Sequence, residues 1–324
     1  MRVMFCLATP AAVRLAAFAL AAFGPAAHAA QTFTPADLPA LPAPLASEGL
    51  LLDVTRVGDA LVAAGAHGVI IQSRDHGRTW TQARVPVSVP LTAVSFFDAQ
   101  HGWAVGHEGV ALRTVDGGNT WERMAAGAGD GASLLTVLAL DRASVLVGGA
   151  YGTLLRSRDG GTTWEKLPPP AEDLHINRLV RGSAGKVLLA GESGTLAVSA
   201  DAGESWEILE SPYEGSFYGL VELSSGRLLA HGLRGHVFTS DDAGATWAQA
   251  PVGEAVLVMG SAEVQPGVVV LGAIGGHLFV SRDGGTAFAH HQPAGLGSVA
   301  AIVAAADGAL VAVGERGVRR ETLP

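Results

Sequence analysis

Apolar residues in this chain come in short runs rather than in long helical stripes. Each run covers about four to seven residues and is bounded by Gly, Asp or Asn, which is typical of strands joined by tight turns. One stretch shows four such runs in succession: Leu91–Phe97, Gly102–Gly106, Gly109–Thr114 and Trp121–Met124. The pattern therefore predicts units of four antiparallel strands, named a, b, c and d in chain order.

A short phrase, Ser/Thr-x-Asp-x-Gly-x-Thr-Trp, follows strand c and occurs six times, the sixth time degraded by Ala287 and Phe288. Successive copies lie 41, 43, 42, 41 and 41 residues apart. A fixed period of about 40 to 45 residues is that of one four-stranded propeller blade. We call these phrases the Asp boxes, and their aspartates are Asp75, Asp116, Asp159, Asp201, Asp242 and Asp283.

The Asp boxes are expected to be structural. A short carboxylate can accept hydrogen bonds from the N–H groups of its own turn, and glycine lets the backbone fold back. The tryptophan of each box would then pack between neighbouring blades. The alternative is a ring of catalytic carboxylates, but copies spaced around a rim would lie too far apart to cooperate.

The turn from strand b to strand c is a Gly-x-x-Gly sequence, in which glycine is expected to supply the positive φ angles of a hairpin. A seventh copy is followed by Val318–Thr322 but by no fourth strand. Because an unpaired edge is a liability, the proline-containing segment Gln31–Ala46 is predicted to donate a closing strand. The copies begin at Gly65, Gly106, Gly149, Gly191, Gly232, Ala273 (where alanine replaces glycine) and Gly314.

These patterns predict an all-β fold, a seven-bladed β-propeller of four-stranded antiparallel blades whose ring is closed by an N-terminal strand. Residues 49–324 are predicted to form the propeller. Residues 30–48 are predicted to be the N-terminal segment that supplies the closing strand, and residues 1–29 a signal peptide.

The signal-peptide prediction rests on a basic start at Arg2 and Arg14, an apolar run over Leu15–Phe23 and a small-x-small site at Ala27–Ala29. A run this short favours export over membrane anchoring, so a soluble periplasmic protein is expected. Cys6 is the only cysteine and would be lost with the leader. The mature chain would then have no disulfide and no cysteine-based metal site or nucleophile.

The net charge argues against nucleic acid and anionic membranes as partners. It is −9 for the whole chain, and loss of Arg2 and Arg14 leaves 19 basic against 30 acidic groups, or −11. No metal or other cofactor is expected, because the eleven histidines, including adjacent His290 and His291, show no standard ligand spacing. Only His67 and His107, on neighbouring turns, could meet. A monomer is expected.

Differences between the repeats point to a recognition surface. The Asp boxes occupy one face, so the b–c turns and the d–a connections of the other face are free to vary. These turns could equally be polar only because they are exposed to water. The turn residues that we expect to bind a partner are His67, His107, Glu108, Tyr151, Glu192, Arg234 and Arg316.

Two further groups of residues are candidates for the same surface. Tyr213, Phe217 and Tyr218 gather aromatic area in one connection, where they either anchor a partner or pack beneath the loop. Arginines of the fourth and fifth repeats form either a partial basic patch or a scattered set: Arg178, Arg181, Arg227 and Arg234.

The Asp boxes and the sequence Trp-Ala-Val-Gly-x-x-Gly at Trp103–Gly109 resemble those of the photosystem II stability/assembly factor family, over essentially all of residues 50–320. The resemblance implies an exported seven-bladed propeller with neuraminidase-type (BNR) repeats. In plants and cyanobacteria such proteins are lumenal chaperones that bind a reaction-centre precursor, partly through an arginine patch. Similar proteins occur in bacteria without oxygenic photosynthesis, and we expect a bacterial member. The sequence departs from the family in net charge, and no arginine cluster matches the patch.

Two classes of function remain open. The expected one is a non-enzymatic exported scaffold or assembly factor that binds a periplasmic or membrane protein. The alternative is a carbohydrate-binding or sialidase-like glycoside hydrolase propeller, which would need an arginine triad, a Tyr–Glu pair and an acidic group near the axis. The residues expected at the inward starts of the a strands are instead mostly apolar or neutral: Leu52, Thr92, Leu135, Asn177, Tyr218, Leu257 and Ala300.

Overall fold

The computed structural model describes residues 34–129 and 131–322. The predicted signal peptide and residues 30–33 therefore lie outside the described residues. All regular elements in the described part are β-strands or short 3-10 turns. Among these residues, no helix has the length and apolar character required to span a bilayer.

The strands form seven antiparallel sheets, six with four strands and one with three. The first three sheets, blades 1 to 3, comprise β1 (Leu51–Val57), β2 (Ala60–Gly65), β3 (Ile70–Ser73), β4 (Thr81–Gln82), β5 (Leu91–Phe96), β6 (Gly102–Gly106), β7 (Ala111–Thr114), β8 (Glu122–Met124), β9 (Leu134–Ala139), β10 (Val145–Gly149), β11 (Leu154–Ser157) and β12 (Glu165–Lys166). Blades 4 to 7 comprise β13 (Ile176–Arg181), β14 (Val187–Gly191), β15 (Leu196–Ser199), β16 (Glu207–Ile208), β17 (Phe217–Glu222), β18 (Leu228–Gly232), β19 (Val237–Ser240), β20 (Ala248–Gln249), β21 (Val258–Gln265), β22 (Val268–Ala273), β23 (Leu278–Ser281), β24 (Ala289–His291), β25 (Val299–Ala304), β26 (Leu310–Gly314) and β27 (Gly317–Glu321).

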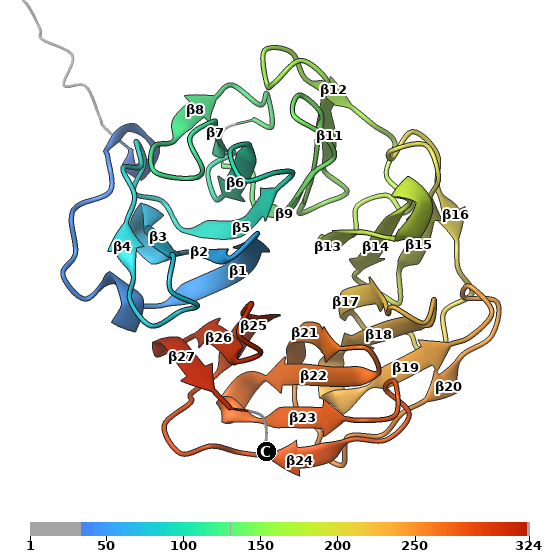
Figure 1. The fold of residues 1–324 in the computed structure, drawn as a ribbon. Helices are drawn as coiled ribbons and strands as arrows, with labels where there is room; N and C mark the ends of the chain where they lie inside the picture. Colours follow the sequence, from blue (N-terminus) through green and yellow to red (C-terminus); the bar gives the residue numbers. More distant parts are fainter. Residues whose placement is uncertain (1–33, 130, 323–324) are drawn as a thin grey trace, which may run out of the picture. The chain divides into compact units, whose positions relative to one another are not determined.

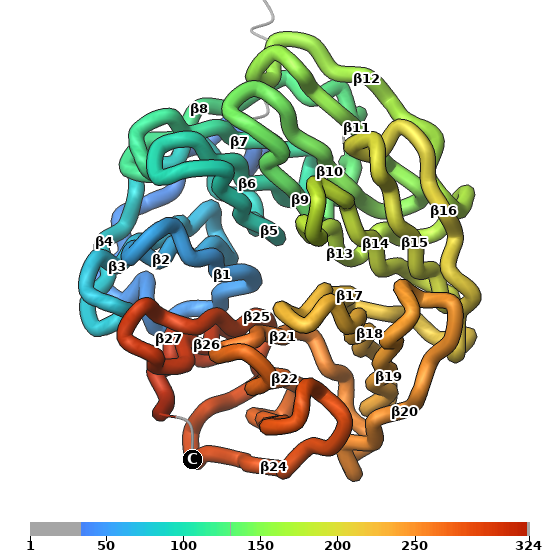
Figure 2. Tube along the Cα trace, turned by 45° about the vertical axis from the view of Figure 1, so that its right-hand side comes forward, coloured from blue at the N-terminus to red at the C-terminus, as the bar shows by residue number. Residues whose placement is uncertain are grey.

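The seven blades form a closed ring (Figure 1). The innermost strands contact one another in the order β1, β5, β9, β13, β17, β21, β25, and β25 also contacts β1. Figure 2 shows blue β1 beside red β25 from a second direction. The prediction of a seven-bladed all-β propeller is confirmed.

Large apolar side chains fill the space between the blades. Trp103 on β6 is buried and meets Trp164 of the next blade edge-on, with ring centres 5.7 Å apart. Trp121 packs in one cluster with Ile70 and Val85 of blade 1, and it meets Phe96 of its own blade edge-on at 5.9 Å. Edge-to-face pairs of this kind add to the stabilisation that apolar burial provides, so the box tryptophans help to join the sheets.

Each innermost strand carries a β-bulge near its start. The register shifts after the first paired residue in all seven strands, for example between Leu51 and Asp53 in β1. In blade 6, Leu257 was predicted as the inward residue at the start of the innermost strand, but the bulged residue is Met259, two positions later. Both residues are apolar, so the sequence pattern did not distinguish them. The bulged residues are Leu52, Thr92, Leu135, Asn177, Tyr218, Met259 and Ala300.

The first glycine of the b–c turn is required by a close approach of two backbones. A Cβ at Gly65 would lie 2.2 Å from the carbonyl oxygen of Leu50. The next residue, Ala66, donates its N–H to that same oxygen at 3.0 Å, and all seven turns repeat this bond. Positive φ falls instead on Gly68 (+69°) and on His67 (+56°). The expectation of positive φ is therefore right for the second glycine and wrong for the first.

The N-terminal segment contributes no strand among the described residues. From residue 34 to residue 50 it contains two 3-10 turns, η1 (Pro35–Asp37) and η2 (Ala46–Glu48), and the seventh sheet ends at β27. The prediction of a closing N-terminal strand is therefore wrong for this part of the chain. The ring closes through the packing of β1 against β25.

The segment instead forms a strap across three blades. The guanidinium of Arg123 on blade 2 donates to Ala36 O at 2.8 Å, and Ala43 N donates to Gln82 Oε1 on blade 1 at 2.8 Å. At blade 7, Ser47 lies so close to Gly317 that a Cβ there would be 2.0 Å from Ser47 O. The strap contains four prolines, which lack the N–H donor of a ladder, and this explains its irregular bonding.

Candidate functional site

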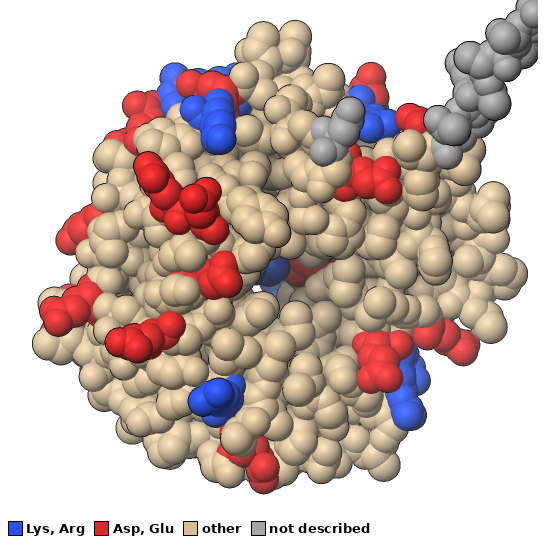
Figure 3. Space-filling view, turned by 180° about the vertical axis from the view of Figure 1, so that it is seen from behind, with Lys and Arg blue, Asp and Glu red and all other residues tan. Residues whose placement is uncertain are grey.

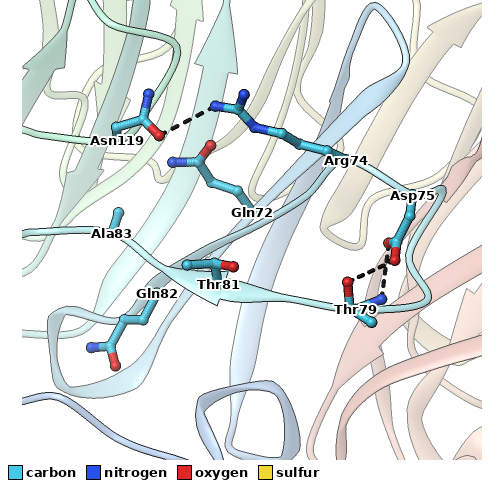
Figure 4. A pocket seen from close by; sticks show the side chains of 8 residues that line it. All are labelled: Gln72, Arg74, Asp75, Thr79, Thr81, Gln82, Ala83 and Asn119. Atoms are coloured by element: carbon cyan, nitrogen blue, oxygen red, sulfur yellow. Dashed lines mark hydrogen bonds between the residues drawn. The ribbon is translucent and has the colours of Figure 1, made fainter.

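Hydrogen bonds within its own turn engage both oxygens of the carboxylate of the first Asp box. Asp75 Oδ1 accepts from Ser73 Oγ at 2.8 Å and from Thr79 N at 2.9 Å, and Oδ2 accepts from Thr79 Oγ1 at 2.6 Å. Figure 4 shows this carboxylate directed towards Thr79, at one end of a groove also lined by Gln72 and Arg74. The groove therefore does not offer a free carboxylate.

The other boxes repeat this arrangement, with Ser205 replacing threonine in the fourth and the last hydroxyl missing in the sixth. Hydrogen bonds from the side chain and the backbone of Thr163 lower the pKa of Asp159 to about 2. The equivalent bonds lower the pKa of Asp201 and of Asp242 to about 2. A carboxylate that its own turn holds ionised is poorly suited to proton transfer, so the geometry is that of a turn lock.

The opposite face carries unlike side chains at its b–c turns. His67, Tyr151, Arg234 and Arg316 are exposed there, Tyr151 by 74%. Glu108 and His107 are half-buried, and His107 Nδ1 lies 3.1 Å from Ser133 Oγ. On the face shown in Figure 3, charged side chains are scattered and acidic ones predominate.

Three residues of this face come together from separate elements. Tyr151 belongs to the b–c turn of blade 3, His175 to the connection before β13, and Glu192 to the b–c turn of blade 4. The rings of Tyr151 and His175 are 5.2 Å apart, and His175 Nδ1 lies 2.6 Å from Glu192 Oε2. The repeat pattern indicates Tyr151 and Glu192 separately but not His175, because the approach of His175 depends on the path of the connection. We call these residues the Tyr151 cluster.

Hydrogen bonds to His175 hold Glu192 in place. The carboxylate oxygen Oε2 also accepts from the backbone N of His175 at 3.1 Å. The backbone and side-chain bonds together lower the pKa of Glu192. The imidazole is thus oriented by an ionised carboxylate, while Tyr151 beside it remains largely exposed. The cluster presents an aromatic surface next to fixed polar groups, which suits recognition of a polypeptide.

The aromatic residues of the Ser211–Tyr218 connection pack beneath it. Tyr213 stacks on His236 with ring centres 4.1 Å apart, and Phe217 is 0% exposed. The prediction that Phe217 binds a partner is therefore wrong, and the packing interpretation describes Tyr213 as well. Tyr218 occupies the bulged position of β17 and is half-buried.

The arginines of the fourth and fifth repeats do not form a patch. Arg181 ends β13 on the Asp-box side, where its guanidinium donates to Ala139 O at 2.6 Å. Arg227 forms an ion pair with Asp241 at 2.7 Å. Arg234 alone of the four stands at a b–c turn. The partial basic patch is thus contradicted, because these side chains leave the sheets at different ends.

Arg178 instead reaches across the bore of the ring. Its Nη1 lies 3.1 Å from Oδ1 of Asp53 on β1, three innermost strands away. Asp53 is buried, and its second oxygen accepts from Val94 N at 3.0 Å. Figure 3 shows charged atoms of both signs inside the central opening. Asp53 is not among the residues predicted from the sequence, although the equivalent positions of five other repeats hold only Gly, Ala or Thr.

His231 on β18 is a second unforeseen polar group in the interior. Its Nδ1 lies 3.1 Å from Val258 O, and its Nε2 has no hydrogen-bond partner among the described residues. Burial lowers the pKa of His231 to about 4. The ring fits because Gly219 faces it, where a Cβ would lie 2.1 Å from Nε2.

The family model described as photosynthesis system II assembly factor YCF48 matches residues 73–172 and 140–322. The chain belongs to this family. A photosystem II stability/assembly factor, HCF136, from Guillardia theta is 47% identical over 45 residues, which are 13% of this chain and 11% of that protein. The HCF136 of Cyanidioschyzon merolae is 39% identical over 80 residues, 24% of this chain and 17% of that protein. The aligned segments thus span less than a fifth of these relatives.

Solved structures share the fold at low sequence identity. YCF48 bound to a D1 peptide is 20% identical with a TM-score of 0.72, covering 86% of this chain and 95% of that one. YCF48 from Cyanidioschyzon merolae is 17% identical with a TM-score of 0.68, covering 86% and 96%. A GH74 xyloglucanase from Xanthomonas campestris is 18% identical with a TM-score of 0.66, covering 84% of this chain and 52% of that one.

Proposed function

We propose that this family member is an exported, non-enzymatic assembly factor that binds a segment of a membrane protein on the face carrying the b–c turns. The Tyr151 cluster is the centre of the binding surface. A solved relative, YCF48, holds a D1 peptide, which supports binding of a polypeptide by this fold.

The observation that carries the proposal is the exposure of the Tyr151 ring beside two polar side chains that hold each other in place. A large aromatic side chain that is 74% exposed lies beside a histidine and a glutamate that fix each other. Exposed aromatic side chains with little conformational freedom are frequent binding anchors, because they bury much area at a small entropic cost. On the other face, the polar atoms of the Asp boxes are engaged by their own turns.

Site-specific photo-crosslinking tests this assignment. A photoreactive amino acid at Tyr151 is expected to capture a membrane protein in intact cells. The matched control is Val115, which is 56% exposed within the second Asp box. Capture of the same protein from both positions, or from Val115 alone, would contradict the choice of face.

Export is part of the proposal and rests on the sequence of the leader. We expect the mature protein to begin at Ala30 and to fractionate with the periplasm. The intact mass of the protein purified from the periplasm checks both points. A full-length mass, or recovery from the cytoplasm alone, would remove export from the proposed function.

The fold shared with GH74 xyloglucanases makes a glycoside hydrolase the second candidate. Such an enzyme needs two carboxyl groups on either side of the scissile bond, about 5 to 10 Å apart. Asp53 is the acidic residue that we locate at the bore, and Arg178 and Val94 N already engage it. Release of reducing sugar from xyloglucan or a sialoside, abolished by Asp53→Asn, would favour the enzyme over the scaffold.

A further inference from the structure

Two histidines meet at the outer edge of blade 6. His277 lies between the 3-10 turn η6 (Ile274–Gly276) and β23, and His290 lies on the outermost strand β24. They lie thirteen positions apart in the sequence, and the hairpin around the sixth Asp box brings them together. His290 is exposed and His277 half-buried, so solvent reaches the pair.

The two rings face each other through nitrogen atoms. His277 Nδ1 and His290 Nε2 are 2.9 Å apart, whereas the ring centres are 4.9 Å apart and the ring planes differ by 14°. Since the nitrogens are closer than the centres by 2.0 Å, they lie between the rings and point at one another. One hydrogen is shared between two lone-pair positions.

Neighbouring side chains hold the rings in this orientation. Phe279 is 0% exposed and lies under His290, with ring centres 5.3 Å apart. Gln292 Nε2 lies 3.3 Å from His277 Nε2 and donates to Gly275 O at 3.0 Å. A second group that contacts the far nitrogen of an imidazole is typical of histidines that bind metals.

We propose that His277 and His290 bind a divalent late transition metal, with Zn²⁺ as the representative ion. The ion replaces the shared hydrogen, which moves to His277 Nε2. The Gln292 amide then turns, gives up its bond to Gly275 O and accepts that hydrogen through its amide oxygen. Two nitrogens on one tetrahedral Zn²⁺ lie about 3.4 Å apart. The nitrogens must therefore move apart by about 0.5 Å, and both rings must tilt so that their lone pairs converge on the ion. Imidazole is a suitable ligand for Zn²⁺.

The site supplies two ligands, and water or a donor from a bound molecule completes the coordination. The described residues contain no group of three or more His, Cys, Asp or Glu side chains placed for a metal. The ion is therefore held reversibly at the surface. Because protons compete with a metal for its ligand nitrogens, the affinity falls on acidification.

Blade 5 provides a matched site with one ligand changed. His236 occupies the repeat position of His277, and Gln249 occupies that of His290, because Phe238 pairs with Gln249 as Phe279 pairs with His290. Gln249 Nε2 lies 3.3 Å from His236 Nδ1. The chain thus contains a histidine pair and a histidine–glutamine pair at equivalent repeat positions. Around them, blade 5 has Pro251 in place of Gln292, and Tyr213 stacks on His236.

Calorimetric titration of the untagged protein with ZnCl₂ tests the proposal. The unmodified protein is expected to bind one equivalent. His290→Gln reproduces the blade 5 arrangement and is expected to lower the affinity at least about tenfold. Gln249→His combined with Pro251→Gln reproduces both contacts of blade 6 and is expected to add a second equivalent. The same two changes together with His290→Gln are expected to give one equivalent again, now at blade 5.

Glutamine already occupies the equivalent position in blade 5, so His290→Gln should fold normally, as circular dichroism would check. The proposal is overturned if the unmodified protein shows no saturable binding. It is also overturned if His290→Gln keeps one equivalent at unchanged affinity, because another histidine would then be the ligand. Failure to gain an equivalent in the variant with both Gln249→His and Pro251→Gln would show that the paired nitrogens do not form the site.

Discussion

The Asp-box rim and the opposite face are both built from tight, glycine-containing turns, yet their side chains are used differently. On the rim, the polar atoms of Ser157 and Asp159 turn back to the N–H groups of their own loop. On the other face, a backbone N–H of each turn donates to a carbonyl oxygen of the preceding connection, as Ala66 N does to Leu50 O. The side chains in the middle of those turns are not needed for that backbone bond, so they can differ from blade to blade. Repetition therefore marks the joints of the ring, and variation marks the surface available to a partner.

Titration with acid should separate the rim from the interior, and it has the largest expected effect. The pKa of buried His231 is lowered to about 4 in the folded state, so between pH 6.5 and 4 the unfolded chain binds more protons. Stability should fall by about 2–3 kcal/mol across that window, because one pKa unit corresponds to about 1.4 kcal/mol. The box aspartates have lowered pKa values, so the stability that their ionised carboxylates contribute is lost at lower pH, between about pH 4 and 2.

Urea unfolding at successive pH values measures both windows. His231→Gln should flatten the dependence between pH 6.5 and 4 and leave the decline below pH 4 in place. An unchanged slope in this variant would show that another group titrates in the upper window.

A pair of identical substitutions compares the two faces directly. Ser157→Ala removes the buried hydroxyl that accepts from Gly161 N at 2.8 Å. The stranded N–H should reduce the free energy of unfolding by about 1–3 kcal/mol. Ser193→Ala, at an exposed b–c turn of the other face, should change it by less than about 0.5 kcal/mol. Equal effects in urea titrations would mean that the faces are not divided as proposed.

The ion pair in the bore belongs to neither face and should have an intermediate effect. Arg178→Ala leaves Asp53 buried without its cation, and a loss of about 1–2 kcal/mol is expected because Arg178 is partly exposed. Asp53→Asn in the same chain should recover part of the loss. A double-mutant cycle by urea unfolding gives the coupling between the two residues, and a coupling near zero would show that the pair does not brace the ring.

The repeats predicted the fold because the sequence of each blade contains the same strand and turn patterns in the same order. The strands of blade 2 were predicted to within two residues at every end. The prediction of a closing N-terminal strand was wrong, because prolines and an unpaired edge suggest a strand but do not determine the path of the chain. The bulge in β21 shows the same limit, since apolar alternation does not reveal which residue a bulge leaves unpaired.

The candidate surface was predicted less completely than the fold. The turn positions followed from the repeat, but Phe217 is buried and Arg181 lies at the other end of its strand. The end of a strand at which a residue lies decides which face of the propeller it reaches. The alternation along the strand, which a bulge shifts, decides which side of the sheet its side chain lies on. The contact of His175 with Glu192 joins a connection to the next turn. Such a pairing depends on the three-dimensional path, which the repeat pattern does not contain.

Removal of the Tyr151 ring should have the smallest effect on stability and a large effect on binding. The ring is 74% exposed, so Tyr151→Ala should change the free energy of unfolding by less than about 0.5 kcal/mol. Loss of an aromatic anchor should weaken capture of the membrane partner about tenfold or more. Quantitative co-purification measures the capture, and Val115→Ala on the rim serves as control because it removes a comparably exposed apolar side chain. If Tyr151→Ala keeps full capture while Val115→Ala loses it, the rim is the binding surface, and the variation among the b–c turns reflects only their contact with water.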